Sequence, residues 1–469
     1  MNKKKLFIEN MLVYGLGGVI SKLVPFIMLP IVTRLMPNTT YFGLNDISVT
    51  IVSFGSALAI MGMYDAMFRI FFEKDEKSFK QEICSSALGF TLSSSIIVFC
   101  ILTIFQQKFS FIFFGTEKYS QLIFLSAVNI LIGTTNTIVS APTRMQNKRK
   151  VYLVTNTLSP VISYSVSIPL LLKGHYLIAL PLASIASAVI IEIIFFLLNK
   201  EWFSFKKINL NYIKNMLKFA LPLLPNFLIY WIFNSSDRLM ISHILGNEQV
   251  GIYAIGGKIG QVSQLIYTAF AGGWQFFAFK TMNENDQVKT NSNIFEYLGV
   301  ITFSTGILMA ACSDFFFRII FTGDYLKGAI VAPYLFIAPL LQMLFQVIGN
   351  QFLIIKKTLP VMLILGVGAV FNVVANLFLI PYLGIEGAAL STLLGYIISV
   401  VICAFVLKRM KLFQMSKRFV ICVMITTVYF VLWRTIFKAY VGVGIVIAII
   451  CILSYIYCYR QDIKILIKK

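Results

Sequence analysis

The stretch FALPLLPNFLIYWIFNSSDRLMISHILG, residues 219–246, sets two adjacent charges, Asp237 and Arg238, behind a long apolar run. A helix that crosses a bilayer needs about 20 mostly apolar residues, and runs of that length recur along the 469-residue chain. Hydrophobic residues make up 58% of the chain and charged residues 13%, whereas a soluble chain carries roughly 25% charged residues. The sequence therefore predicts an all-α polytopic membrane protein.

We expect about 14 transmembrane helices, because the apolar runs are long enough to span and are separated by short polar loops. Their approximate limits are residues 9–34, 42–68, 83–105, 119–141, 151–172, 176–198, 216–244, 250–279, 294–313, 329–353, 360–381, 384–406, 418–435 and 440–459. No loop is long enough to form a separate domain, so any function must reside mainly in the membrane helices.

Prolines interrupt the first and the seventh span at comparable places, Pro25 and Pro30 in one and Pro222 and Pro225 in the other. Because proline removes a backbone hydrogen bond and bends a helix, we expect bends in both spans. Bent helices at equivalent places suit elements that move during gating.

The basic residues predict that both termini are cytoplasmic. The formal net charge is +21. Lysines and arginines concentrate in every second loop, on the side that holds the N-terminus, as they do in cytoplasmic loops. Since no Lys/Arg-rich domain lies outside the apolar runs, this distribution argues against a nucleic-acid partner.

Two halves of the chain resemble each other. Three pairs of residues at equivalent span ends are each 212 positions apart: Tyr41 and Tyr253, Arg144 and Lys356, and Pro169 and Pro381. The offset predicts two pseudo-symmetric six-helix bundles, 1–205 and 206–410, followed by two additional transmembrane helices in 411–469. In transporters built from such repeats, the substrate site lies between the halves and is reached by alternating access.

Two charges, Lys22 and Lys258, lie deep within predicted spans, and Asp46 occupies the repeat position of Lys258. A charge at the centre of a span costs about 2.5–3.5 kcal/mol on insertion scales. Lys22 lies roughly 20 Å into the first span at 1.5 Å per residue, so we expect it to line a cavity, with membership of a structural ion pair as the alternative. Asp46 and Lys258 are 212 positions apart; this favours two facing cavity walls and leaves open a pair between them.

Two further pairs of charges lie near predicted span ends. Asp65 and Arg69 are four residues apart and share a helix face, so an interfacial ion pair is the alternative to a cavity role. Asp237 and Arg238 point about 100° apart on a helix. Each therefore needs its own partner or water, which favours a polar cavity over a bare helix end.

The tenth span carries a stripe of amides, Gln342, Gln346 and Asn350, spaced four residues apart. Amides at helical spacing can join transmembrane helices by hydrogen bonds. They can also bind sugar hydroxyls. Both interpretations remain open at this point.

The chain shows no motif for a cofactor, a metal or an enzymatic reaction. GIYAIGGKIG, residues 251–260, resembles a phosphate loop but has Ile259 where that motif requires Ser or Thr after the lysine. Seven cysteines are scattered singly and the two histidines lie far apart, so we expect no metal site. We expect a transporter without a cofactor, and not an enzyme.

Residues 219–259, FALPLLPNFLIYWIFNSSDRLMISHILGNEQVGIYAIGGKI, resemble the seventh and eighth helices of bacterial polysaccharide flippases. Further similar stretches are MGMYDAMFRIFFE at 61–73, AGGWQFFAF at 271–279 and FNVVANLFLIPYLGIEGAALSTLLGY at 371–396. These flippases are O-antigen and capsule repeat-unit exporters of the multidrug/oligosaccharidyl-lipid/polysaccharide exporter superfamily. The resemblance covers essentially the whole chain.

The resemblance implies a V-shaped cavity between two bundles in the bacterial inner membrane. An oligosaccharide linked to undecaprenyl pyrophosphate would cross there to the outer leaflet, driven by a gradient of H⁺ or Na⁺, while its lipid tail stays in the bilayer. We expect Lys22, Arg34, Arg238 and Lys258 to contact the anionic headgroup. Asp46, Asp65 and Asp237 are candidates for ion coupling or for orienting those cations.

Three alternatives remain open. A lipid II-type flippase and a multidrug/cation antiporter belong to the same superfamily, and a membrane-embedded polysaccharide polymerase belongs to another class. Polymerases usually carry a large outer loop, which this sequence lacks. Polysaccharide polymerase and chain-length machinery are the protein partners that the resemblance implies.

Overall fold

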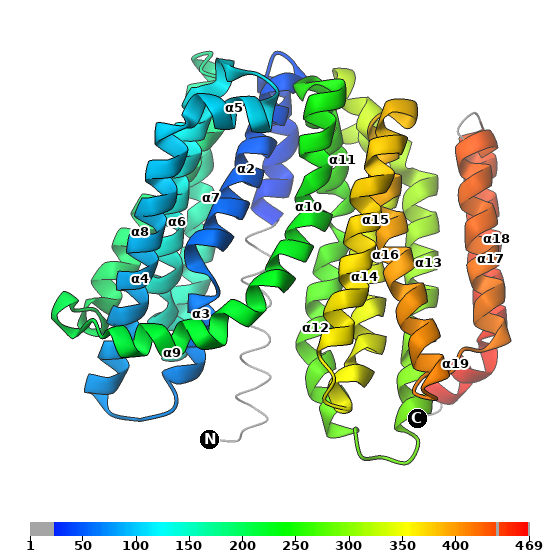
Figure 1. Ribbon diagram of the computed structural model, residues 1–469. Helices are drawn as coiled ribbons and strands as arrows, with labels where there is room; N and C mark the ends of the chain where they lie inside the picture. The colour runs from blue at the N-terminus through cyan, green and yellow to red at the C-terminus, as the bar shows by residue number, and fades with distance from the viewer. Residues whose placement is uncertain (1–22, 438–439, 468–469) are drawn as a thin grey trace. The chain divides into compact units, whose positions relative to one another are not determined.

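The computed structural model describes residues 23–437 and 440–467, and no strand occurs in that part of the chain (Figure 1). After an apolar helix at Leu23–Leu35, the first helices are α2 (Thr39–Ile60), α3 (Met63–Ile70), α4 (Lys77–Ile104), α5 (Gln106–Phe114), α6 (Ser120–Met145), α7 (Arg149–Leu172), α8 (Ala179–Asn199), α9 (Leu210–Ala220) and α10 (Leu224–Leu245). They are followed by α11 (Asn247–Gly260), α12 (Ser263–Lys280), α13 (Gln287–Ile320), α14 (Ala332–Ile354), α15 (Leu359–Leu383), α16 (Ile385–Arg409), α17 (Lys417–Leu432), α18 (Val441–Cys458) and α19 (Arg460–Ile467).

From Leu23 onward, the fourteen expected spans coincide with one helix or with two consecutive helices. Within the described residues, ten helices, or eleven if a bent pair counts as one span, are long and apolar enough to cross a membrane. The first span is described only from Leu23, and the eighth is broken between α11 and α12. The helices confirm the prediction of an all-α polytopic membrane protein, and α5 is an addition that the sequence analysis missed.

The helices form two compact units, Met1–Gly251 and Ile252–Lys469. The first unit extends beyond the predicted bundle 1–205, because α9 packs on α3 and α4 and α10 packs on α2. Figure 1 shows α9 lying across the ends of its neighbours in this unit. The two compact units do not show whether the halves are structural repeats. The halves 1–205 and 206–410 and the segment 411–469 therefore stay predictions.

The core of the first unit lies where α3, α4, α6 and α9 meet. Met63, Ile83 and Met216 are completely buried in one apolar cluster there. A polar contact fastens α8 to α6: the side-chain amide of Asn199 donates to the carbonyl of Val139 at 2.9 Å and to the hydroxyl of Thr143 at 2.8 Å. Apolar burial thus joins α9 to the bundle, and a buried amide sets the position of α8.

The seventh span is bent, as its prolines predict. α9 and α10 meet at 54° across the turn Leu221–Leu223. Pro222 and Pro225 lie at this break and remove two helical N–H donors. The first-span prolines, Pro25 and Pro30, lie within the helix Leu23–Leu35.

In the second unit, α15 and α16 form a close antiparallel pair. A Cβ on Gly387 would overlap the carbonyl of Leu379, so only glycine permits this approach. The amide of Asn372 on α15 donates to the hydroxyl of Thr392 on α16 at 3.1 Å. Small residues and hydrogen bonds of this kind are the usual means of packing transmembrane helices.

A buried carboxylate attaches the C-terminal helices to α13. Glu296 is 3% exposed and accepts hydrogen bonds from the backbone and hydroxyl of Ser416, at 2.6 and 2.7 Å, and from the phenol of Tyr459 at 2.9 Å. Arg418 lies 3.7 Å from the same carboxylate and 2.5 Å from Asp462 of α19.

Replacing this carboxylate should loosen the C-terminal helices. In Glu296→Ala the donors on Ser416 and Tyr459 lose their acceptor, at a cost of about 1–3 kcal/mol for each buried group left unsatisfied. We expect a lower midpoint of thermal unfolding in detergent and faster tryptic cleavage at Lys411. The control is Glu201→Gln, which removes an ion pair with Lys77 whose side chains are 48% and 62% exposed. Equal midpoints for the two variants would contradict the anchoring role of Glu296.

Candidate polar site on α2 and α10

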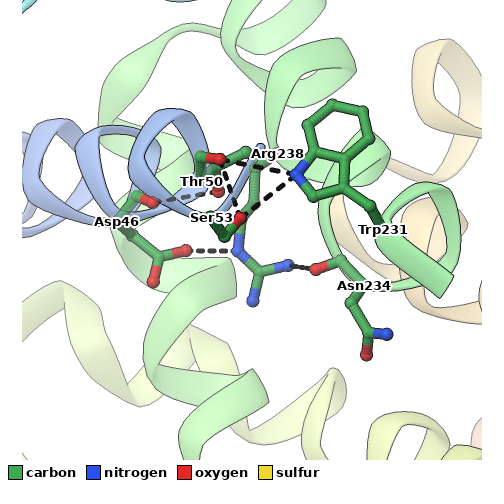
Figure 2. Close-up of polar contacts among 6 residues, drawn as sticks. All are labelled: Asp46, Thr50, Ser53, Trp231, Asn234 and Arg238. Atoms are coloured by element: carbon green, nitrogen blue, oxygen red, sulfur yellow. Dashed lines mark hydrogen bonds and ion pairs between the residues drawn. The ribbon is translucent and has the colours of Figure 1, made fainter. Parts of the chain in front are cut away.

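Two helices of the first unit face each other with polar side chains (Figure 2). On α10, Trp231, Asn234 and Arg238 recur at intervals of three and four residues, which places them along one face. On α2, Asp46, Thr50 and Ser53 recur at the same intervals. Helical spacing on both elements therefore produces two matching polar stripes.

A buried ion pair lies at one end of these stripes. The guanidinium Nε of Arg238 donates to Oδ2 of Asp46, and its Nη1 donates to the carbonyl of Asn234. The side chains of Arg238 and Asp46 are only 10% and 5% exposed. A charge taken out of water needs a partner of opposite charge and further hydrogen bonds, and these contacts supply both.

The other end of the stripes is more accessible. The indole Nε1 of Trp231 donates to the hydroxyl of Ser53 at 3.1 Å and to the carbonyl of Thr50 at 3.4 Å. The centre of the Trp231 ring system lies 4.6 Å from the ring centre of Phe54. Ser53 and Asn234 are exposed and Trp231 is partly buried, so an aromatic ring, a hydroxyl and an amide border the ion pair.

The end of α10 is also tied to its neighbours. Asn247 accepts from the hydroxyl of Ser242 at 2.7 Å and donates to the carbonyl of Phe114 at 3.1 Å. A Cβ on Gly251 would overlap the carbonyl of Thr39, so α11 approaches α2 backbone to backbone. These contacts hold the end of α10 and the start of α11 next to α2. They thereby help to place Arg238 beside Asp46.

The structure brings together only some of the predicted site residues. Arg238 pairs with Asp46, and Asp237 is buried next to Arg238 on α10. Arg34 and Asp65 are exposed, on Leu23–Leu35 and on α3. Lys22 lies outside the described residues, so its role stays a prediction.

The remaining predicted residues belong to the second unit. Lys258 is partly buried on α11, and the amides Gln342, Gln346 and Asn350 lie on α14. Oε1 of Gln346 and Nδ2 of Asn350 are buried without a hydrogen-bond partner in the described part of the chain. These two atoms therefore do not join helices by hydrogen bonds in this structure.

The interfacial ion pair with Arg69, suggested as the alternative role of Asp65, does not form. Among the described residues, Asp65 and Arg69 form no ion pair; the Arg69 guanidinium lies 4.8 Å from the ring centre of Phe219 instead. No group of three or more His, Cys, Asp or Glu side chains that could hold a metal ion occurs among the described residues. Thr50, Ser53 and Asn234 were not among the predicted site residues, although their helical spacing from Asp46 and Arg238 could have revealed them.

Removing one member of the buried pair should cost more than removing both. In Asp46→Asn or Arg238→Gln a charge stays buried without its partner, at about 3–5 kcal/mol, and the double variant leaves no such charge. Thermal unfolding of the four proteins in detergent gives the coupling energy. The exposed pair Asp324–Lys327 provides a control cycle with little coupling. Additive effects at Asp46 and Arg238 would rule out the pair as a stabilising contact.

A family model described as "Polysaccharide biosynthesis protein" matches residues 7–276. An uncharacterised membrane protein of Methanocaldococcus jannaschii is 25% identical to this chain over 260 residues. The match covers 54% of this chain, and the chain spans about half, 50%, of that relative's length.

Solved structures share the fold. A structure of the lipid II flippase MurJ in an inward closed conformation superposes with a TM-score of 0.71 at 16% identity, covering 96% of this chain and all of that one. An inward-facing multidrug resistance MATE family transporter gives 0.59 at 14% identity, covering 83% of this chain and 94% of that one. At these identities the likeness concerns the fold alone. Because the family model matches more than half of the chain, this multi-pass membrane protein belongs to the polysaccharide biosynthesis protein family.

Proposed function

We propose that the protein flips oligosaccharide repeat units linked to undecaprenyl pyrophosphate from the cytoplasmic to the outer leaflet of the bacterial inner membrane, by alternating access. The observation that carries the proposal is the match to a polysaccharide biosynthesis family over residues 7–276 of a chain with a transporter fold. The repeat units would build O-antigen, capsule or a similar surface polysaccharide. A polymerase and its chain-length machinery would take up the product.

The pair Asp46–Arg238 offers a way to bind and release an anionic headgroup. In this structure the carboxylate of Asp46 accepts a hydrogen bond from Nε of Arg238. A phosphate is also a strong partner for a guanidinium when water is excluded, so it would compete with Asp46. In the proposal, the headgroup takes the place of Asp46 on Arg238 during transport.

The same exchange gives Asp46 a role in coupling. Once displaced, the carboxylate is free to take up H⁺ or Na⁺, and its release returns Asp46 to Arg238. Asp237, buried beside Arg238, is a second candidate for the ion. Asp65 is exposed on α3 and stays a weaker candidate in the proposal.

The accessible margin of the site suits a sugar. Trp231 presents an aromatic ring, while Ser53 and Asn234 present a hydroxyl and an amide. Aromatic faces and neutral hydrogen-bonding groups together match the apolar and polar sides of a sugar ring. Lys22, Arg34 and Lys258, with the amides of α14, are further proposed contacts.

A second candidate function is lipid II flipping, which the superposition on the MurJ structure favours. Lipid II and a polysaccharide repeat unit share a polyprenyl pyrophosphate carrier, so the anion contacts proposed here serve either substrate. The difference between them lies in the sugar portion, which the transport measurement therefore has to compare.

The proposal is tested by translocation in proteoliposomes. Undecaprenyl-pyrophosphate-linked oligosaccharide is placed in the inner leaflet, and its exposure to a glycosidase outside is followed with and without an H⁺ or Na⁺ gradient. We expect protein-dependent exposure of the sugar and a rate at least roughly tenfold lower in Arg238→Gln and in Lys22→Ala, since each lost charge-assisted contact corresponds to about 1.4 kcal/mol or more.

Controls separate the alternatives. Lys327→Gln removes a surface cation whose side chain is 64% exposed and should leave the rate unchanged. Faster transfer of lipid II than of the oligosaccharide would move the assignment to the second candidate. Absence of transfer for both substrates, together with gradient-driven efflux of a cationic dye, would refute the proposal in favour of a drug antiporter.

A further inference from the structure

Arg144 is held by aromatic side chains instead of a carboxylate. It lies in the last turn of α6 and donates from Nη1 to the hydroxyl of Tyr64 on α3 at 2.9 Å. Its guanidinium carbon lies 6.0 Å from the ring centre of Tyr64 and 5.4 Å from that of Tyr152 on α7. Three helices of the first unit therefore position one guanidinium.

These contacts orient the charge without neutralising it. Arg238, Arg418 and Arg434 each pair with a carboxylate, whereas Arg144 forms no ion pair with any described residue. Asp65 follows Tyr64 directly on α3 but does not pair with Arg144 there. A guanidinium carries five N–H donors, and the phenol of Tyr64 uses one, so the exposed side chain keeps donors for a ligand.

The surroundings favour an anion. Lys148 stands at the N-cap position of α7 and Arg149 and Lys150 are its first two residues; Lys148 and Lys150 are exposed. Tyr152 belongs to the first turn of α7, whose start has no side-chain cap and bears the positive end of the helix dipole.

We propose that Arg144 binds a phosphate-type anion, namely the pyrophosphate of the lipid-linked substrate when it first reaches the protein. The inference rests on the proposed function and extends it, because Arg144 lies on α6 and not in the polar site of α2 and α10. A planar guanidinium presents two parallel donors to a phosphate, which a lysine cannot do. The tyrosines act as positioning residues, since they hold the guanidinium plane in advance of binding.

Binding of farnesyl pyrophosphate to the full-length protein in nanodiscs of phosphatidylcholine tests the site. We expect Arg144→Gln to weaken binding by at least roughly tenfold, the effect of losing a bidentate charged contact, and Arg144→Lys to restore it only in part. Tyr64→Phe, which keeps the ring and loses the hydroxyl, should give an intermediate loss. The matched control is Arg409→Gln, because Arg409 is an exposed guanidinium over a single ring, 4.7 Å from the centre of Phe405.

Each outcome of the experiment decides something. Equal affinity of wild type and Arg144→Gln, or an equal loss in Arg409→Gln, would overturn the proposal. A second series with phosphatidylglycerol in the nanodiscs distinguishes two sources of the phosphate. If that lipid displaces the probe only when Arg144 is present, the anion site stands and a bilayer headgroup occupies it too.

Transport separates this inference from the proposed function. If the wild type binds the probe through Arg144 but moves no substrate, the anion site stands and the flippase assignment fails. If the wild type flips substrate and Arg144→Gln needs no more substrate for half-maximal rate, the flippase assignment stands and the role of Arg144 is refuted.

Discussion

The central constraint on this protein is that lipid offers no partner to a charge or a polar group. A buried carboxylate is therefore stabilised by a cation or a hydrogen-bond donor from within the chain. Three arginine–carboxylate pairs meet this demand in the described residues, and each joins elements far apart in sequence: Asp46 with Arg238, Glu296 with Arg418, and Glu386 with Arg434. The contacts that neutralise these carboxylates therefore also hold distant helices together.

The pair Asp46–Arg238 illustrates how packing and site depend on each other. It can form only because α10 lies along α2, and that register rests on Asn247 and on the bare backbone at Gly251. The bend of 54° before α10 redirects the chain from α9, which lies on α3 and α4. A buried ion pair is costly to assemble, which agrees with the proposal that a headgroup replaces one partner during transport.

Arg144 shows the opposite arrangement. Tyrosine rings and one phenol hold its guanidinium, and they contribute no negative charge. The same residue type thus serves two purposes in one unit. At Arg238 the positive charge is cancelled within the protein, whereas at Arg144 it remains for an incoming anion.

The amino-acid sequence by itself determined the fold class, the approximate limits of the spans and the bend of the seventh span. Each of these is a local property: the length of an apolar run decides whether a helix crosses lipid, and a pair of prolines close together removes helical hydrogen bonds and favours a bend. The family resemblance could also be recognised from the sequence, because the stretch that shows it, residues 219–259, is continuous in the chain.

Only the tertiary structure decided which charges are partners. Helical spacing indicated that Asp237 and Arg238 need separate partners, but it could not select Asp46, which lies 192 residues before Arg238. Nor could it separate Arg144, clamped by tyrosines of two other helices, from the basic residues around it. The physical reason is the range of the interaction: hydropathy acts on each helix alone, whereas an ion pair or an aromatic clamp exists only after distant helices have packed.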